Sequence, residues 1–394
     1  MLHNIKVPLS SDERKKLETV DEVKIKCGNE TFKLTRQRFD YDHANALKWM
    51  FLPTFIEVSM YILIVLISGM KELPLKSDDL SFSGLVIVIA TVGTLITFTC
   101  SFWLGKKKNL NYAKTIQWRN FPAIAVAVTI IVLVSFLFGF YMMDRIFKDL
   151  MLNMVLATVL CSVLFGIMNY VTLYFMFSIS PMRLTSLLTN IMLGGVTIAM
   201  LTNSDTHWWK QHLSFLGSSQ ATSSWQFNIT LILSAMLMIS LVDSVFISLR
   251  KTYGTHKGLH ILRWLLIFMA LSLAFVGYFT VDGPRNFPKF HNIAAKSMVI
   301  SVIVMIMMNG LLIPKVTKEF SAISYLAGLG LVVFSIIHAN GHITLTVFEI
   351  VSFLIAFTWI MLLFQFLNHL MEPDEEIFKI EVVNIENDDN LINK

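Results

Sequence analysis

The sequence predicts an all-α polytopic membrane protein with about ten transmembrane helices. Of its 394 residues, 55% are hydrophobic and only 15% are charged. A soluble domain of this length needs more charge to cover its surface. The apolar residues also fall into runs of about 20, which is the length that crosses a hydrocarbon core of about 30 Å.

Ten such runs follow one another along the chain. The fourth and fifth are separated only by Ser178–Arg183, where Pro181 and its polar neighbours predict a tight turn between two helices. Polar or charged segments separate the others. The predicted spans are 49–70, 82–104, 121–143, 151–179, 184–203, 226–249, 260–281, 294–314, 320–338 and 343–367.

The distribution of Lys and Arg supports this number of spans. Ten basic residues lie between Lys6 and Lys48, and five lie between Lys106 and Arg119, after the second span. Connections on the opposite side carry fewer, and neighbouring carboxylates offset several. Because basic loops stay in the cytoplasm, we expect a multi-pass protein of the cell membrane with both termini cytoplasmic. Because the Lys and Arg residues cluster in short loops beside apolar runs, they indicate the lipid bilayer, and not nucleic acid, as the partner.

The N-terminal segment, residues 1–48, is polar. Apolar and polar residues alternate at 23–27 and 31–34 around Gly28-Asn29, which predicts a small β-hairpin. We interpret this segment as a membrane-apposed cap that sets topology. The alternative is a module that docks a cytoplasmic protein partner.

The rest of the chain divides by composition. Loops after residue 182 become rich in Trp, His, Ser and Gly, so we predict a four-helix membrane region at 49–182 and a six-helix membrane domain at 183–370. Residues 371–394 are acidic and rich in Asn, which predicts a disordered cytoplasmic tail.

The longest connection on the outward side carries the most varied polar chemistry. It runs from Asp205 to Asn228 and contains three Trp, which are typical of an interfacial aromatic belt. Ser214 and Gly217 stand in an apolar context at the membrane surface. Their backbone groups need partners there, or a cavity to line.

Half of the ten histidines are expected on the same side, close to Asp205 and Asp282. Three His with a carboxylate can hold Zn²⁺ and activate water. No HExxH or comparable spacing is present, so we expect no cofactor and favour hydrogen bonding to headgroups, water or backbone. His212 and His291 remain the metal-ligand candidates. The outward histidines are His207, His212, His291, His338 and His342.

Four ionisable residues fall within or at the ends of predicted spans. A charge at membrane depth is costly and usually faces a bundle interior or a cavity. Glu349 and Lys296 are expected at similar depth, where they can pair. Asp243 lies two turns from Arg250, which favours an interfacial position. The set is Glu57, Asp243, Lys296 and Glu349.

A series of short motifs marks the second half of the chain. They are Trp209, Leu213-Ser214-Phe215-Leu216-Gly217, Phe227-Asn228 opening a helix, Gly277-Tyr278-Phe279 ending one, and His291-Asn292-Ile293-Ala294-Ala295 starting the next. In these, residues 184–370 resemble the bacterial membrane family called domain of unknown function 998. That family is distantly similar to DRAM-type and GPI-lipid-remodelling membrane proteins. The resemblance implies a six-helix bundle and, by analogy of fold, lipid handling.

Three functional hypotheses follow, and they leave open whether the protein is an enzyme. The first is binding of a lipid or small hydrophobic ligand near the outer leaflet. The second is a membrane hydrolase or acyltransferase that uses His291, His212 and Asp282. The third is a noncatalytic transporter subunit or sensor whose N-terminal hairpin docks a protein. The residues expected at the rim of the ligand site are Ser214, Gly217, Asn228, Asp282 and His291.

Overall fold

A computed structural model describes most of the chain and confirms the all-α polytopic fold. Within the described residues, ten helices are long and apolar enough to cross a membrane. The short turn predicted between the fourth and fifth spans is present, because one helix ends at Phe177 and the next begins at Pro181. The described residues are 3–9, 22–27, 30–35, 38–70, 72–77, 80–108, 113, 116–205, 207–222, 224–371 and 378–384.

The two ends of the chain form one compact unit, residues 1–44 with 372–394, and residues 45–371 form the other. In the first unit, β2 (Glu22–Cys27) and β3 (Glu30–Thr35) pair antiparallel, which confirms the predicted hairpin. The predicted division of the membrane part near residue 182 stays a prediction.

The C-terminal tail differs from its prediction over part of its length. Residues 378–384 form strand β6 (Phe378–Asn384), which pairs in parallel with β1 (His3–Leu9). Apolar residues alternate along β6 at Phe378, Ile380 and Val382, which suits a strand despite the acidic composition around it. The expected disorder of 371–394 therefore does not hold for this segment, and 372–377 and 385–394 lie outside the described residues.

The described residues before 180 form four helices, namely α2 (Arg38–Ser68), α3 (Phe82–Lys107), α5 (Phe121–Ile146) and α6 (Met154–Phe177). At one end, β4 (Glu72–Pro74) and β5 (Met151–Asn153) pair antiparallel and tie two connections together. A core of aromatic residues holds the helices, with Phe82 packed edge-on against Tyr61 and Phe140.

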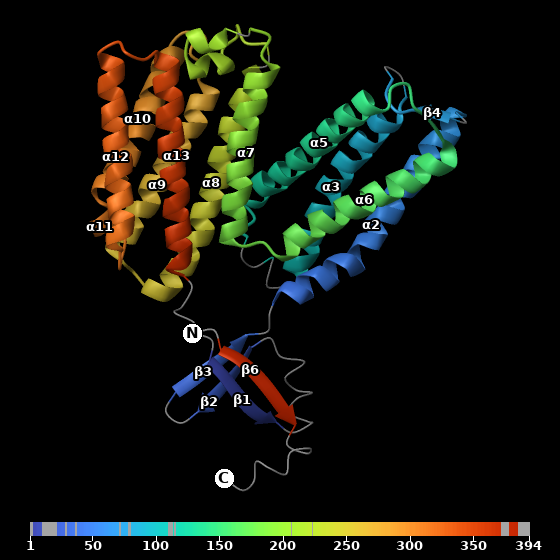
Figure 1. The fold of residues 1–394 in the computed structure, drawn as a ribbon, viewed down its shortest axis with the longest axis horizontal. Helices are drawn as coiled ribbons and strands as arrows, with labels where there is room; N and C mark the ends of the chain where they lie inside the picture. Colours follow the sequence, from blue (N-terminus) through green and yellow to red (C-terminus); the bar gives the residue numbers. More distant parts are fainter. Residues whose placement is uncertain are drawn as a thin grey trace. The chain divides into compact units, whose positions relative to one another are not determined.

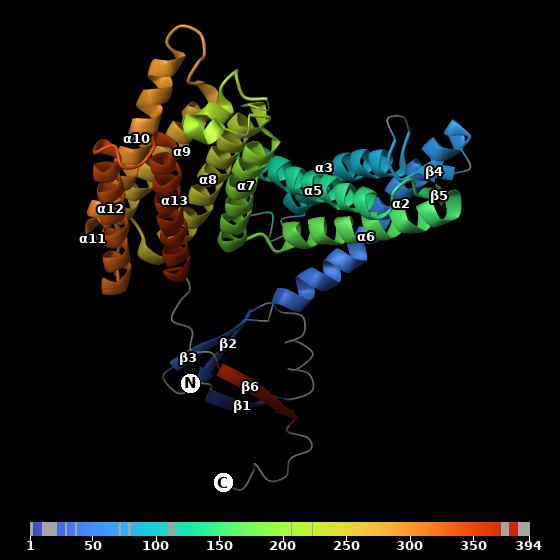
Figure 2. The same ribbon diagram turned by 45° about the horizontal axis from the view of Figure 1, so that its top comes forward.

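Seven α-helices follow in the described part of the chain after residue 180. The six longer ones run side by side in Figures 1 and 2. Buried residues make up 72% of the most apolar stretch of α8 but 11% of that of α12, so α8 is central and α12 peripheral. The helices are α7 (Pro181–Thr202), α8 (Ser224–Tyr253), α9 (Lys257–Tyr278), α10 (Phe287–Met307), α11 (Asn309–Leu312), α12 (Lys318–Ala339) and α13 (Leu345–His369).

The eighth span begins earlier than predicted. We expected 294–314, whereas α10 covers Phe287–Met307 and is followed by the short α11. Pro288 lies in the first turn, where its missing N–H and fixed φ are compatible with a helix. His291 and Lys296 therefore lie on a helix, and His291 is not in a surface loop.

Candidate functional site

The connection between α7 and α8 folds into two short 3₁₀ helices, η1 (Trp208–Lys210) and η2 (Leu213–Gly217). η2 contacts α8 and α13. Phe215, Leu216 and Gly217 are buried, and Leu216 packs into an apolar cluster with Val196 of α7. η2 is therefore a packed part of the bundle end and not a freely solvated loop.

His291 in the first turns of α10 joins η2 to the end of α9. Its Nδ1 lies 2.7 Å from the backbone oxygen of Phe279, and its Nε2 lies 3.3 Å from Oγ of Ser214. Because a carbonyl oxygen can only accept, Nδ1 carries a proton and donates it to Phe279, while Nε2 faces the Ser214 hydroxyl. Only 5% of His291 is exposed, so the structure places its imidazole beside a hydroxyl in a largely dry setting.

Gly217 and Asn228 form the second contact of η2. The Asn228 side-chain amide donates to the Gly217 carbonyl at 2.9 Å. A Cβ at Gly217 would lie 2.3 Å from Oδ1 of Asn228, so only glycine allows this approach. Gly277 plays the same part on α9, where a Cβ would lie 2.8 Å from the Asn228 backbone oxygen.

Asp282, between α9 and α10, holds the segment just after η2. It accepts from the backbone N–H of Ser219 at 2.8 Å and from its hydroxyl at 2.5 Å. Desolvation alone would raise the pKa of Asp282, but the hydrogen bonds from Ser219 outweigh it and the pKa is lowered. Asp282 thus orders the loop, and the contacts of the described residues do not link it to His291.

All five predicted rim residues therefore meet around η2 and the turn that follows it. Their polar groups are bonded to one another, to backbone or, for Asp282, also to the Ser219 hydroxyl. Within the described part of the chain, no three His, Cys, Asp or Glu side chains are grouped so that they could hold a metal ion. Partial burial, and then the nearby His291, lower the pKa of His212, which favours its neutral form. The predicted rim residues are Ser214, Gly217, Asn228, Asp282 and His291.

The predicted pairing of Glu349 with Lys296 is not found. Glu349 on α13 instead accepts from the backbone N–H of Leu213 at 2.5 Å, at the start of η2. Lys296 is exposed, and the ion pairs among the described residues do not include it. Glu349 therefore adds a third tether for η2, beside His291 and Asn228.

The comparisons with known proteins address this same half of the chain. Residues 189–365 match the model of the family described as "Protein of unknown function (DUF998)". The predicted resemblance is confirmed over these residues. No curated protein and no solved structure matches the chain. The DUF998 segment runs from α7 into α13 and includes η2 with all of its tethers.

Asp243, on α8 within the DUF998 segment, lies in a buried ion-pair cluster, and its expected interfacial depth stays a prediction. It is 1% exposed and accepts from Arg263 of α9 at 2.9 Å. Outside the segment, Arg119 and Asn120 also donate to it, at 2.5 and 3.0 Å. Sequence reasoning missed these three partners. The available signal was Arg263, a cation inside an apolar run that needs a carboxylate nearby.

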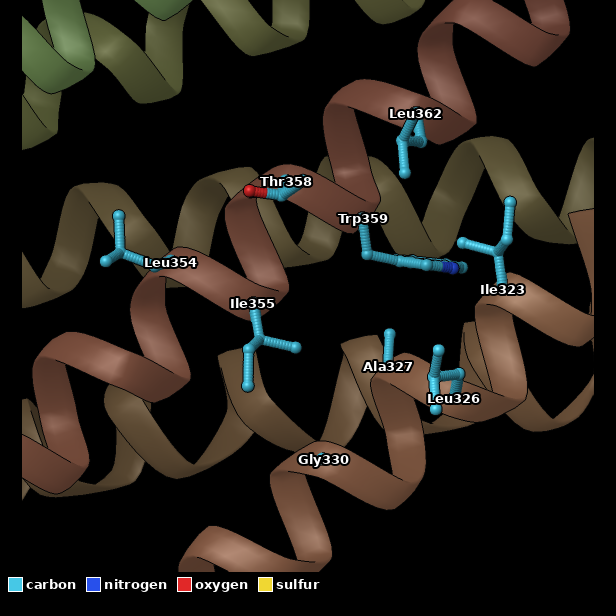
Figure 3. Close-up of a pocket in the computed structure, with 9 residues that line it drawn as sticks. All are labelled: Ile323, Leu326, Ala327, Gly330, Leu354, Ile355, Thr358, Trp359 and Leu362. Carbon is cyan, nitrogen blue, oxygen red and sulfur yellow. The ribbon is translucent and has the colours of Figure 1, made fainter.

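The DUF998 segment also contains an open apolar groove between α12 and α13, drawn in Figure 3. Its volume is about 400 Å³. The Trp359 ring extends from α13 toward α12, and its N–H donates to Oγ of Ser324 at 3.0 Å, which fixes the ring. The lining is apolar apart from Thr358, and sequence analysis did not single it out. The lining residues are Ile323, Leu326, Ala327, Gly330, Leu354, Ile355, Thr358, Trp359 and Leu362.

Proposed function

We propose that this protein binds a membrane lipid through one acyl chain, which lies in the α12–α13 groove. The groove carries this proposal, because it is an apolar concavity within two candidate spans. Its volume falls in the range of roughly 300–1,000 Å³ found for small-molecule sites. An acyl chain offers only dispersion and hydrophobic contacts, which is what this lining accepts.

The position of the groove favours a chain from the bilayer over a protein partner. α12 exposes Leu326 and Leu329 along the peripheral surface of the bundle, where hydrocarbon is the solvent. Gly330 leaves space toward α13, since a Cβ there would meet only Ile355 at 3.4 Å. A lipid chain can therefore enter sideways without unfolding either helix.

The groove lies nearer the start of α12 than its end. Ile323 is five residues from the start at Lys318, about 8 Å along the helix, whereas Gly330 is nine residues from the end, about 14 Å. In the expected topology the start is cytoplasmic, so we propose a lipid of the cytoplasmic leaflet. This differs from the outer-leaflet ligand expected from the loops around η2.

Photo-crosslinking tests the proposal. The protein is reconstituted in vesicles that contain a phospholipid with a photoreactive group on one acyl chain, and crosslinked peptides are mapped by mass spectrometry. Crosslinks are expected to concentrate at 323–330 and 354–362. Ala327→Phe fills the groove and should reduce them about tenfold, as a loss of roughly 1.4 kcal/mol does.

Leu329→Phe is the matched control, because Leu329 lies on the exposed side of the same helix and does not line the groove. It should leave the crosslinks unchanged. Equal yields in Ala327→Phe and the unchanged protein, or crosslinks spread evenly over all exposed helices, would show that the groove holds no particular lipid chain.

A hydrolase or acyltransferase is the second candidate, because Ser214 Oγ lies 3.3 Å from Nε2 of His291. Ser214 Oγ would attack the carbonyl carbon of an ester while Nε2 takes its proton and later passes it to the leaving alcohol. The acyl group on Ser214 would then pass to water or to another alcohol. The Phe279 carbonyl, and not Asp282, would orient the imidazole.

A fluorophosphonate probe distinguishes this candidate. An activated Ser214 should be labelled in the intact protein, and labelling should disappear in Ser214→Ala and in His291→Gln. Cys161→Ser, at a buried thiol on α6 that lies outside the DUF998 segment, serves as control. An unlabelled Ser214 in folded protein would leave the contact as a structural tether.

We also propose that the protein resides in the cell membrane with both chain ends in the cytoplasm, as the basic loops favour. The association of both ends in one unit supports a folded cytoplasmic module that could receive a protein partner. Deleting residues 1–40 should leave insertion intact. Loss of insertion would instead assign this module to topology alone.

A further inference from the structure

A buried polar cluster lies among α2, α3 and α6, far along the chain from the groove. Glu57 of α2 is 6% exposed and is the fourteenth of the 25 residues in the span Ala44–Ser68. At 1.5 Å per residue it lies about 20 Å from one end of the span and about 17 Å from the other. Its carboxyl group thus belongs to the middle of this candidate span.

Asn169 of α6 holds this carboxyl group in place. Its side-chain amide donates to Oε2 of Glu57 at 2.7 Å and to the hydroxyl oxygen of Thr54 at 3.1 Å. Its own oxygen accepts from the Thr97 hydroxyl of α3 at 3.2 Å, which sets the orientation of the amide. Asn169 is fully buried, so all of its polar atoms are used within the protein.

The other carboxyl oxygen, Oε1 of Glu57, is buried without a hydrogen-bond partner among the described residues. It packs over Gly93 of α3, where a Cβ would lie 2.1 Å from it. Tyr61 and Thr172, one turn from Glu57 and from Asn169, also have buried oxygens without a partner there. Among the described residues, the carboxyl group therefore accepts one hydrogen bond, from Asn169, and the polar oxygens nearby have no hydrogen-bond partner.

A negative charge is poorly supported at this position. The ion pairs among the described residues involve Asp144 and Asp243, and none involves Glu57. An ion transferred to such a setting loses more hydration free energy than one hydrogen bond returns. The titratable groups nearby are Tyr61 on α2 and Cys161 on α6, both mainly uncharged at neutral pH. α3 presents Gly93 and Thr97.

We propose that Glu57 is a proton-binding site in the middle of the membrane, with Asn169 as its positioning residue. When the proton is bound, Glu57 is a neutral carboxylic acid. Its Oε2 is then the carbonyl oxygen that accepts from Asn169, and its Oε1 carries the proton. Release of that proton leaves a charge that this packing does not accommodate. Proton release is therefore coupled to separation of α2 from α3 and α6, or to entry of water between them.

Infrared spectroscopy of the protein in vesicles tests the site directly. A protonated carboxyl group has its own C=O stretching band, which shifts on exchange into D₂O. The difference between the unchanged protein and Glu57→Gln at pH 7 is expected to show one such band. Identical spectra in this region would mean that Glu57 is ionised and would overturn the proposal. Taking the difference removes the contribution of Glu349, which both proteins contain.

Adding sodium chloride at constant pH tests whether Glu57 binds a proton or a metal cation. The band should not change, whereas its loss on adding Na⁺ would show that Glu57 is an ionised cation ligand. If Glu57→Gln does not fold, dicyclohexylcarbodiimide, which reacts with protonated carboxyl groups in apolar surroundings, replaces it. Labelling of Glu57 in the unchanged protein is expected. Labelling of the exposed Glu319 alone would overturn the proposal.

Discussion

Asp243 and Arg119 are 124 positions apart in the sequence, yet a guanidinium nitrogen of Arg119 lies 2.5 Å from the Asp243 carboxylate. Arg263 donates to the other carboxylate oxygen, so one buried anion faces two cations. Arg119 precedes α5 and Arg263 belongs to α9. This contact therefore joins the first four helices to the DUF998 segment.

Replacing Asp243 with Asn should destabilise the protein strongly. The carboxylate is 1% exposed, and its loss leaves two guanidinium groups without their anion, which costs about 3–5 kcal/mol for a buried pair. Thermal unfolding in detergent, followed by circular dichroism, measures the change. The Arg119 side chain is 61% exposed, so the lower end of this range is expected.

Asp144→Asn is the control for that experiment. Asp144 pairs with Lys76 at 3.2 Å, but the two side chains are 32% and 59% exposed. A solvent-exposed pair contributes about 1 kcal/mol or less, so this variant should unfold close to the unchanged protein. Equal effects of the two substitutions would mean that burial of Asp243 does not govern its contribution.

Gly194 and Gly195 offer a matched test of how α7 packs against α8. A Cβ at Gly195 would lie 2.3 Å from the Thr230 hydroxyl oxygen of α8, whereas a Cβ at Gly194 meets nothing within 4 Å. Gly195→Ala should therefore lower stability by about 1–3 kcal/mol through overpacking. Gly194→Ala should be neutral or stabilising by about 1 kcal/mol, because alanine favours the helix. The reverse order would contradict this packing.

The contact of Gly217 with Asn228 should govern the order of η2. Gly217→Ala pushes a methyl group toward Oδ1 of Asn228 and breaks the bond to the Gly217 carbonyl. Hydrogen exchange of residues 207–222 should become faster while exchange in the helices stays unchanged. Gly139→Ala, on α5 with nothing near its Cβ, is the control. Unchanged exchange in the loop would show that this contact does not hold η2.

The same loop should become less stable as the pH falls. The pKa of His212 is lowered from its ordinary 6.5, so folding favours the neutral imidazole. Its contribution is present above pH 6.5 and is lost as the pH falls from there toward the lowered pKa. The protection of 207–222 against hydrogen exchange, corrected for the pH dependence of the intrinsic exchange rate, should thus fall between pH 7.5 and pH 5, by an amount that depends on the partial burial of His212.

Two comparisons isolate His212 in that measurement. His212→Gln should flatten the pH dependence, whereas His342→Gln, on the exposed connection between α12 and α13, should not. Asp282 does not contribute in this range, because its pKa is lowered from 3.8 and its stabilising effect is lost only at more acidic pH. A pH dependence that persists in His212→Gln would assign it to another group.

The sequence alone determined the class of fold and the residues of the η2 region. Ten spans were predictable because a helix in lipid must form all of its backbone hydrogen bonds within itself. Each span therefore appears in the sequence as one continuous apolar run of sufficient length. The strand β6 was missed because a short alternating stretch in an acidic tail carries little local signal. The start of α10 was misplaced because Pro288 and the polar residues after it resemble a loop. A proline in the first turn is nevertheless compatible with a helix.

The tertiary structure alone decided which side chains meet. Ser214 and His291, or Asp243 and Arg119, come together only when helices distant in the chain pack, and no local pattern encodes that pairing. The groove depends on Gly330 facing Ile355 across two helices, and the Glu57 site depends on Asn169 and Gly93 from two others. Burial and hydrogen bonding are properties of such assembled surroundings, and they set what each of these residues can do.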